Sequence, residues 1–115
     1  MPLKPIKTKP RIEAIMTNPG RASKLAVDVL GHRWPEAEPY ILKDPFFAYY
    51  YALHLVKDRW PEYEKIMLSN PKKYMNYLVG YATSILKSRW PEAETHMTPT
   101  VRNRYIEIIK ILHGK

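Results

Sequence analysis

The chain has 115 residues, 45% of them apolar and 12% aromatic, with no cysteine and a net charge of +8. This length favours one domain with a thin core, the apolar fraction excludes a disordered chain, and the lack of cysteine excludes disulfides, thiolate metal sites and a cysteine nucleophile. Because no apolar run reaches the ~20 residues of a membrane span and the first residues lack the apolar core of a secretion signal, we expect a cytoplasmic protein without membrane contact.

The first segment, residues 1–12, is predicted to be a basic arm. It combines three prolines with the cations Lys4, Lys7, Lys9 and Arg11. Proline-rich basic termini are commonly extended, so we expect an extended and mobile arm. Residues 13–115 are then predicted to form a single α-helical domain.

Four helices are predicted to begin where a polar residue precedes proline, at Asn18-Pro19, Asp44-Pro45, Asn70-Pro71 and Thr98-Pro99. The polar side chain accepts an orphan backbone N–H, and proline suits the first helical position. Small and apolar residues follow the first three starts with helical spacing. The resulting stripes are Ala22, Leu25, Ala26, Val29 and Leu30; Ala48, Tyr51, Ala52, Leu55 and Val56; and Leu78, Tyr81, Ala82, Ile85 and Leu86, the third helix being about one turn longer.

A nearly identical phrase follows each of these helices: Arg33-Trp34-Pro35-Glu36-Ala37-Glu38, Arg59-Trp60-Pro61-Glu62-Tyr63-Glu64 and Arg89-Trp90-Pro91-Glu92-Ala93-Glu94. Proline followed by two glutamates opens a helix, and we expect short helices near residues 35–42, 61–68 and 91–97. Tandem phrases of this kind predict an array in which each unit packs on its neighbours. The predicted fold is all-α, a short αα-hairpin repeat array or solenoid of three units with a C-terminal capping helix.

The succession of Asx-Pro, Ala-x-x-(Tyr/Leu)-Ala and Arg-Trp-Pro-Glu-x-Glu resembles a tandem α-helical repeat of uncharacterised tailed-bacteriophage and large DNA virus proteins. The units of that repeat are similar to DPxxAYxYAxxVxxGRWPEAE. The resemblance covers residues 13–94 and is strongest over residues 44–64. It implies a viral protein with an αα-repeat fold, and it implies no catalytic activity.

The repeated arginines and tryptophans each have two interpretations. The arginines would form a basic ladder for phosphates, or they would bind helix ends and pair with Glu36, Glu62 or Glu92. The tryptophans would stack on bases, or they would pack as wedges between repeats. We favour the structural interpretation for the whole motif, which comprises Arg33, Trp34, Pro35, Arg59, Trp60, Pro61, Arg89, Trp90 and Pro91.

The sequence offers no catalytic or metal-binding constellation. The two glutamates of each phrase are two positions apart, so their side chains diverge on a helix. The four histidines, at positions 32, 54, 96 and 113, share no ligand spacing, and no glycine-rich phosphate loop is present. We therefore predict a protein that is not an enzyme and has no catalytic residue, metal or cofactor.

Two groups of residues are predicted to contact partners, although both would equally serve to cover neighbouring repeats. Phe46, Phe47, Tyr49 and Tyr50 lie beside the stripe of the second helix and suit a protein partner. A second group of cations suits contacts with nucleic-acid phosphates, and two of them, Lys72 and Lys73, mix with the rings of Tyr74 and Tyr77 as on single-stranded nucleic-acid surfaces. It comprises Lys4, Lys7, Lys9, Arg11, Lys72, Lys73, Arg102 and Arg104.

The predicted function is that of a non-enzymatic binding module, a small phage accessory protein that docks on a host or viral protein through its helical-repeat surface. One alternative is a nucleic-acid-binding protein, because the net charge of +8 suits phosphate contacts. A further alternative is a structural component of the virion. The sequence does not define the partner or the oligomeric state.

Overall fold

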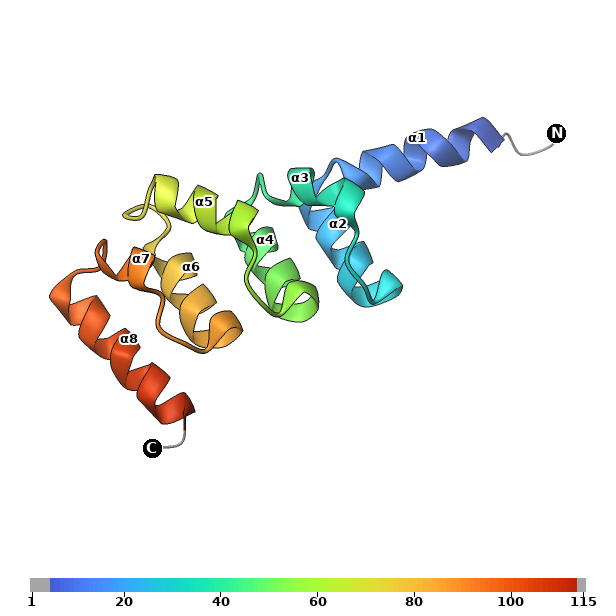
Figure 1. The fold of residues 1–115 in the computed structure, drawn as a ribbon. Helices are drawn as coiled ribbons and strands as arrows, with labels where there is room; N and C mark the ends of the chain where they lie inside the picture. Colours follow the sequence, from blue (N-terminus) through green and yellow to red (C-terminus); the bar gives the residue numbers. More distant parts are fainter. Residues whose placement is uncertain (1–4, 114–115) are drawn as a thin grey trace. The chain divides into compact units, whose positions relative to one another are not determined.

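The computed structural model describes residues 5–113, with side chains from Arg11 onward, and this part of the chain is helical without any β-strand (Figure 1). The all-α fold is thereby confirmed. The helical segments are α1 (Pro5–Met16), α2 (Pro19–Leu25), η1 (Ala26–Leu30), η2 (Pro35–Ala37), α3 (Glu38–Ile41), α4 (Pro45–Tyr51), η3 (Ala52–Val56), α5 (Pro61–Ser69), α6 (Met75–Gly80), η4 (Tyr81–Leu86), α7 (Pro91–Glu94) and α8 (Pro99–Leu112).

The chain divides into two compact units, residues 1–55 and residues 56–115. The division falls inside η3 and not at a linker. Chains built from repeats make most of their contacts between neighbouring segments, so they can divide into compact units where one repeat ends and the next begins. The single domain over residues 13–115 and the tandem stacking of the repeats stay predictions.

The N-terminal segment differs from the expected extended arm. Residues 5–16 form helix α1, while Lys4 lies outside the described residues and the side chains of Lys7 and Lys9 are not described. Pro5 occupies the first helical position, where a missing N–H costs no hydrogen bond. The stretch from Arg11 to Met16 is rich in good helix formers, which favours the helix over an extended chain.

Three of the four predicted helix starts are confirmed, at Pro19, Pro45 and Pro99. At each one the preceding polar side chain accepts a backbone N–H of the first turn, which satisfies an orphan donor. These bonds run from Arg21 N–H to Asn18 (3.1 Å), from Phe46 N–H to Asp44 (3.0 Å) and from Val101 N–H to Thr98 (3.2 Å).

The start predicted at Asn70-Pro71 is displaced by four residues. Residues 71–74 form a turn in which Tyr74 N–H donates to the Asn70 carbonyl at 3.1 Å, and α6 begins at Met75. Tyr74 has φ −103° and ψ 20°, which are not helical values, so the turn does not continue into α6. The prediction of a longer third helix is therefore wrong: the extra residues form a separate turn.

The helices that follow Trp-Pro also depart from their predicted lengths. Helix α5 has the expected length, whereas α7 ends at Glu94. In the first phrase the chain forms a 3₁₀ turn, η2, and then restarts as α3. Pro39 explains this interruption, because its nitrogen has no hydrogen to donate to the Pro35 carbonyl four residues earlier.

Each of the helices α2, α4 and α6, which precede the three Arg-Trp-Pro phrases, runs into a wide π-helical turn followed by a residue in the left-handed conformation. These residues are Gly31 (φ 71°), Lys57 (φ 58°) and Lys87 (φ 54°). The π turn rotates the end of the helix relative to the predicted stripe. In the first helix Val29 and Leu30 lie on the surface instead of in the core, with 71% of Val29 exposed, whereas Ile85 at the same position of the third stripe is buried.

In the first unit, α2 packs against α3 and α4 through small residues. The side chains of Ala22, Ala26, Ala48 and Ala52 are fully buried, which lets the helix backbones approach closely. Gly20 extends this contact, since a methyl group there would lie 3.0 Å from the Phe47 ring. The fully buried residues of this unit also include Ala37, Ile41 and Tyr51.

In the second unit, a continuous row of aromatic rings forms the core. The ring centroids lie 5.7 Å apart for Trp60 and Tyr63, 5.6 Å for Tyr63 and Tyr81, and 5.2 Å for Tyr81 and Trp90. All four residues are buried. The tilted and edge-on ring orientations are those that aromatic pairs prefer, so this row both fills the core and fixes its geometry. Helices α6 and α8 lie side by side in this unit (Figure 1).

Candidate functional site

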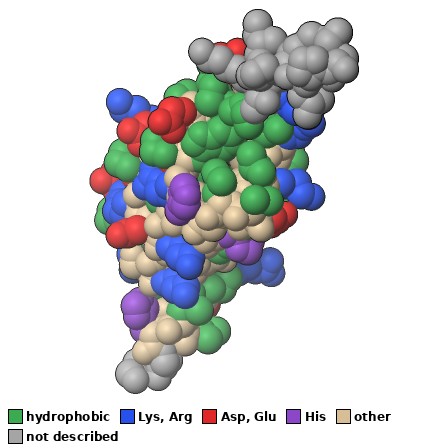
Figure 2. Space-filling view, turned by 90° about the vertical axis from the view of Figure 1, so that its right-hand side faces the viewer, with side chains coloured by type: hydrophobic (Ala, Val, Ile, Leu, Met, Phe, Trp, Pro, Cys, Tyr) green, Lys and Arg blue, Asp and Glu red, His purple; other side chains and the backbone are tan. Residues whose placement is uncertain are grey.

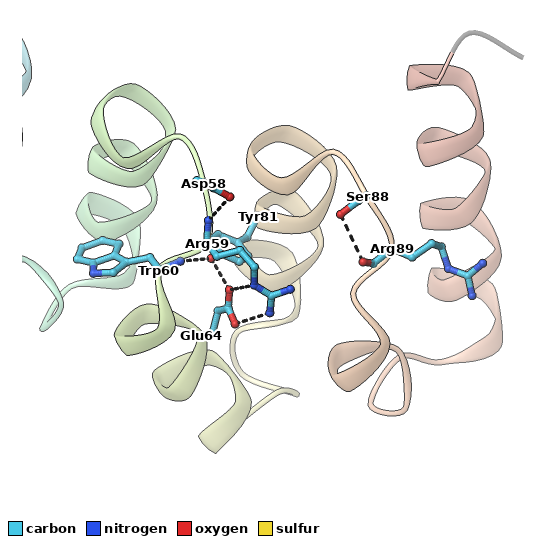
Figure 3. A network of polar contacts seen from close by, with 7 residues as sticks. All are labelled: Asp58, Arg59, Trp60, Glu64, Tyr81, Ser88 and Arg89. Atoms are coloured by element: carbon cyan, nitrogen blue, oxygen red, sulfur yellow. Dashed lines mark hydrogen bonds and ion pairs between the residues drawn. The ribbon is translucent and has the colours of Figure 1, made fainter.

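Each Arg-Trp-Pro-Glu-x-Glu phrase folds into the same ion pair, of which Figure 3 shows the second copy. The arginine donates through Nε and Nη2 to both carboxylate oxygens of the second glutamate, five residues later. This bidentate geometry is the strong form of an ion pair. The distances are 2.8 and 2.8 Å for Arg33 and Glu38, 3.1 and 2.7 Å for Arg59 and Glu64, and 2.6 and 2.7 Å for Arg89 and Glu94.

A tyrosine from the following long helix closes each network (Figure 3). The hydroxyl of Tyr81 donates to Glu64 Oε2 at 2.6 Å and accepts the backbone N–H of Trp60 at 2.6 Å. Tyr51 and Tyr105 make the same two bonds, to Glu38 and Trp34 and to Glu94 and Trp90, at 2.7 and 2.6 Å in each case. One hydroxyl thereby joins a phrase to the helix that comes after it.

The network accounts for the pattern of tyrosines among the long helices. Tyr51 and Tyr105 each stand seven residues after their capping residue, Asp44 or Thr98. At the same place in α2 the residue is Leu25, and no Arg-Trp-Pro phrase precedes α2 in this sequence. A tyrosine therefore stands where a preceding phrase supplies its hydrogen-bonding partners.

The network keeps the carboxylates of Glu38 and Glu94 ionised by lowering their pKa values. The hydrogen bonds from Arg89 outweigh burial and lower the pKa of Glu94 to about 2. Burial raises the pKa of Glu38, but the bonds from Arg33 and the network tyrosine leave it below its usual value. Burial and the bond to the carboxylate raise the pKa of Tyr105 to about 12, and the pKa values of the other two network tyrosines are raised for the same reasons. At neutral pH Tyr51 and Tyr105 are accordingly neutral donors to charged acceptors.

The glutamate that pairs with each arginine is not the one expected. We predicted pairs with the first glutamates, Glu36, Glu62 and Glu92, which lie exposed on the surface. The Trp-Pro corner turns the chain so that the second glutamate faces back toward the arginine, as in the pair of Arg59 and Glu64. Trp60 and Trp90 are buried and Trp34 is half-buried, which fits packing better than base stacking.

The predicted partner-binding residues lie on the surface of the first unit. Phe46 is 53% exposed, and Phe47, Tyr49 and Tyr50 are half-buried. Phe46 and Phe47 pack edge to face, and together with Tyr50 and Lys24 they line a cavity of about 150 Å³. Figure 2 shows a face on which hydrophobic side chains gather in a continuous group with charged side chains at its edge.

The structure does not gather the predicted nucleic-acid residues into one site. Lys72 lines a cavity of about 400 Å³ with Pro71, Met75, His96 and Thr98, and Lys73 is exposed beside it. Arg104 lines a different cavity, between α6 and α8, while Arg102 is half-buried. Arg11 is exposed on α1 in the first unit.

One surface was missed by sequence reasoning. We define the C-terminal groove as the cavity of about 420 Å³ lined by Arg89, Ile106, Ile109, Lys110 and His113. Ile106, Ile109 and Lys110 of α8 and His113, which follows the helix, share the helical spacing i, i+3, i+4 and i+7, and that spacing was the available signal. It was hidden because the apolar residues of α8 suggested only a capping helix.

Among the side chains described, no group of three or more histidine, aspartate or glutamate residues is arranged to hold a metal ion. Within the described range, no helix combines the length and apolar character that crossing a bilayer requires.

No protein-family model matches this chain, and no match is found among curated proteins or solved structures. The resemblance to phage and viral repeat proteins therefore stays a prediction from the motif.

Proposed function

We propose that this protein is a non-enzymatic binding module that docks on a protein partner through exposed surfaces of its helices. Titratable groups with strongly shifted pKa values are usual at catalytic sites. Here the described groups with shifted pKa values belong to the three networks, apart from Tyr50, whose hydroxyl donates to Asp28 at 3.2 Å. These groups form hydrogen bonds and ion pairs with one another that stabilise the fold. That use supports a binding role over a catalytic one.

The observation that carries this proposal is the exposure of large apolar side chains outside the networks. Phe46 on α4 is 53% exposed, and on α8 the exposed fractions are 38% for Ile108, 68% for Ile111 and 48% for Leu112. Single exposed apolar residues are ordinary, but several on one helix are typical of an interaction surface. A protein partner would bury these side chains and gain the free energy of removing them from water.

The proposal is tested by purifying the tagged full chain from a lysate of its native cell and treating half of the bound material with nuclease. We expect a protein to be retained at a fixed ratio in both halves. Phe46→Ser or Ile111→Ser should weaken its retention, because each removes exposed apolar area without touching a network. Bound material that disappears on nuclease treatment would contradict a protein partner.

Nucleic-acid binding is the second candidate, and the turn before α6 favours it. Lys72 and Lys73 are exposed there, and the Lys73 ammonium lies 5.2 Å from the centroid of the Tyr74 ring. Cations beside rings suit single-stranded nucleic acid. If this candidate holds, a fluorescent single-stranded oligonucleotide should bind with a steep loss of affinity as salt rises, and Lys72→Glu should abolish that binding. Salt-insensitive binding would argue against it.

A further inference from the structure

We propose that the C-terminal groove binds an acidic protein segment that carries large apolar side chains. This inference rests on the proposed function and specifies its partner. The groove lies in the second unit, between the C-terminal half of α8 and Arg89, which precedes α7. Apart from Arg89 of the repeated phrase, its residues belong to neither of the two groups that were predicted to contact partners.

The floor of the groove is aliphatic. Ile106 and Ile109 line it on one stripe of α8, and the volume of about 420 Å³ has room for more than one apolar side chain. Ile109 is only 5% exposed and is held in place by the core, so the floor is already formed before any ligand arrives. Preformed apolar floors of this kind take leucine, methionine or phenylalanine anchors from a partner.

The rim of the groove is cationic. Arg89, Lys110 and the imidazole of His113 line it, and no carboxylate of the described residues does. Lys110 forms no ion pair with any described residue, and its own helix places it at the rim. An acidic segment would place its carboxylates against these cations, and charge complementarity of this kind guides partner choice.

Arg89 serves both the network and the rim. It donates Nε and Nη2 to Glu94, which leaves further N–H groups of its guanidinium fork. Its side chain is 53% exposed, so those groups are open to a ligand. The ion pair with Glu94 fixes the guanidinium in position, and this preorganisation reduces the entropy that a partner must overcome.

The aliphatic floor distinguishes a protein segment from a nucleic acid. Bases bind single-strand surfaces by stacking on aromatic rings. Among the described residues that line the groove there is no phenylalanine, tyrosine or tryptophan, and His113 supplies the one ring. Leucine-like anchors flanked by carboxylates match the floor and the rim together, as in helix-in-groove recognition.

The test uses the purified full chain and a fluorescent helical peptide of about 15 residues, with leucine at i, i+3, i+4 and i+7 and glutamate between. We expect this peptide to bind, and its counterpart with lysine in place of glutamate not to bind. Lys110→Glu should weaken binding about tenfold, because it puts a carboxylate at the rim. Arg104→Glu is the matched control: it makes the same charge change on α8 outside the groove and should alter affinity less than about twofold.

An equal loss of peptide affinity in Lys110→Glu and Arg104→Glu would mean that the peptide is attracted to the net charge of the protein, and it would overturn the groove as the site. Binding of a single-stranded oligonucleotide that Lys110→Glu abolishes, with no peptide binding, would overturn the inference in favour of a phosphate site. Failure of the peptide to bind the wild-type chain, when a nuclease-resistant protein partner is still retained from lysate, overturns the groove and leaves the proposed function standing. Failure of both overturns both.

Discussion

At the scale of single residues, the second glutamate of each phrase bears an unusual number of interactions. Glu64 accepts two bonds from Arg59 and one from Tyr81, while its side chain is only 11% exposed. A buried carboxylate is stable only when its charge is compensated, and here a guanidinium and a phenol share that task. Glu62, two residues earlier, is exposed and forms no ion pair within the described residues.

We predict that Glu64→Gln lowers the free energy of unfolding by about 2 kcal/mol, because it removes the negative charge to which Arg59 and Tyr81 donate their hydrogen bonds. Glu62→Gln makes the same chemical change in the same phrase and should cost less than about 0.5 kcal/mol. Urea unfolding followed by circular dichroism measures both. Equal costs for the two variants would contradict the assignment of the network to the second glutamate.

Acid is a second probe at this scale. The pKa of Glu94 is about 2 in the folded chain against 4.5 for an unperturbed glutamate, so the carboxylate contributes stability that is fully present above pH 4.5. This contribution is lost as the pH falls from 4.5 toward 2. We expect a loss on the order of 1 to 2 kcal/mol, since the half-exposed Arg89 is screened by water. Urea unfolding of Glu94→Gln should show a shallower decline over that range, and parallel curves for the two proteins would exclude this role.

The identity of the network residues was only partly predictable. The motif itself and its structural interpretation came from repetition, which needs no coordinates. The pairing could not be read from sequence, because a contact five residues apart depends on the turn made at Trp60-Pro61. Tyr51 and Tyr81 were predicted as members of the apolar stripes, and a stripe position does not indicate which groups the hydroxyl bonds.

At the scale of helices, capping residues predicted where most helices begin, whereas the apolar stripes, which extend over a whole helix, predicted burial less well. The cap at Asp44 is confirmed because capping depends on adjacent residues alone. The stripe prediction fails at Val29, which is exposed, but holds at Ile85, which occupies the same position in the third helix and is buried. Both helices end in a π turn, so burial at this position depends on what packs against the helix and not on the helix alone. The start at Asn70 is displaced because residues 71–74 close their own turn.

The left-handed residues after the long helices give a test of this scale. A lysine at φ 58° crowds its Cβ against the backbone, whereas glycine does not. Lys57→Gly should therefore raise stability by about 0.5 to 1 kcal/mol, and Gly31→Ala should lower it by about 1 kcal/mol. A methyl group on Gly31 would meet no atom within 4 Å beyond its chain neighbours, so the effect of that substitution reports the backbone alone. Thermal unfolding measures the stability of both variants. A destabilised Lys57→Gly variant would contradict the claim that Lys57 is strained by its left-handed conformation.

At the scale of the whole molecule, the same network occurs once in the first unit and twice in the second. The three ion pairs involve three arginines and three glutamates, so the remaining side chains still carry the excess of eight positive charges. The networks thus stabilise the fold without neutralising it. The charge stays available at surfaces such as the C-terminal groove, where an acidic partner is expected.

The central claim is that the repeated phrase maintains the fold through its three tyrosine hydroxyls. The most direct measurement is thermal unfolding of the triple variant Tyr51→Phe, Tyr81→Phe and Tyr105→Phe, which keeps every ring and every charge. Each lost hydroxyl leaves a Trp N–H unsatisfied and should cost about 1 to 2 kcal/mol, so the sum approaches the whole stability of a domain of this size. We predict that the triple variant loses its cooperative unfolding transition, while Tyr40→Phe with Tyr74→Phe melts like the wild type. A triple variant that melts at the wild-type temperature would contradict the claim.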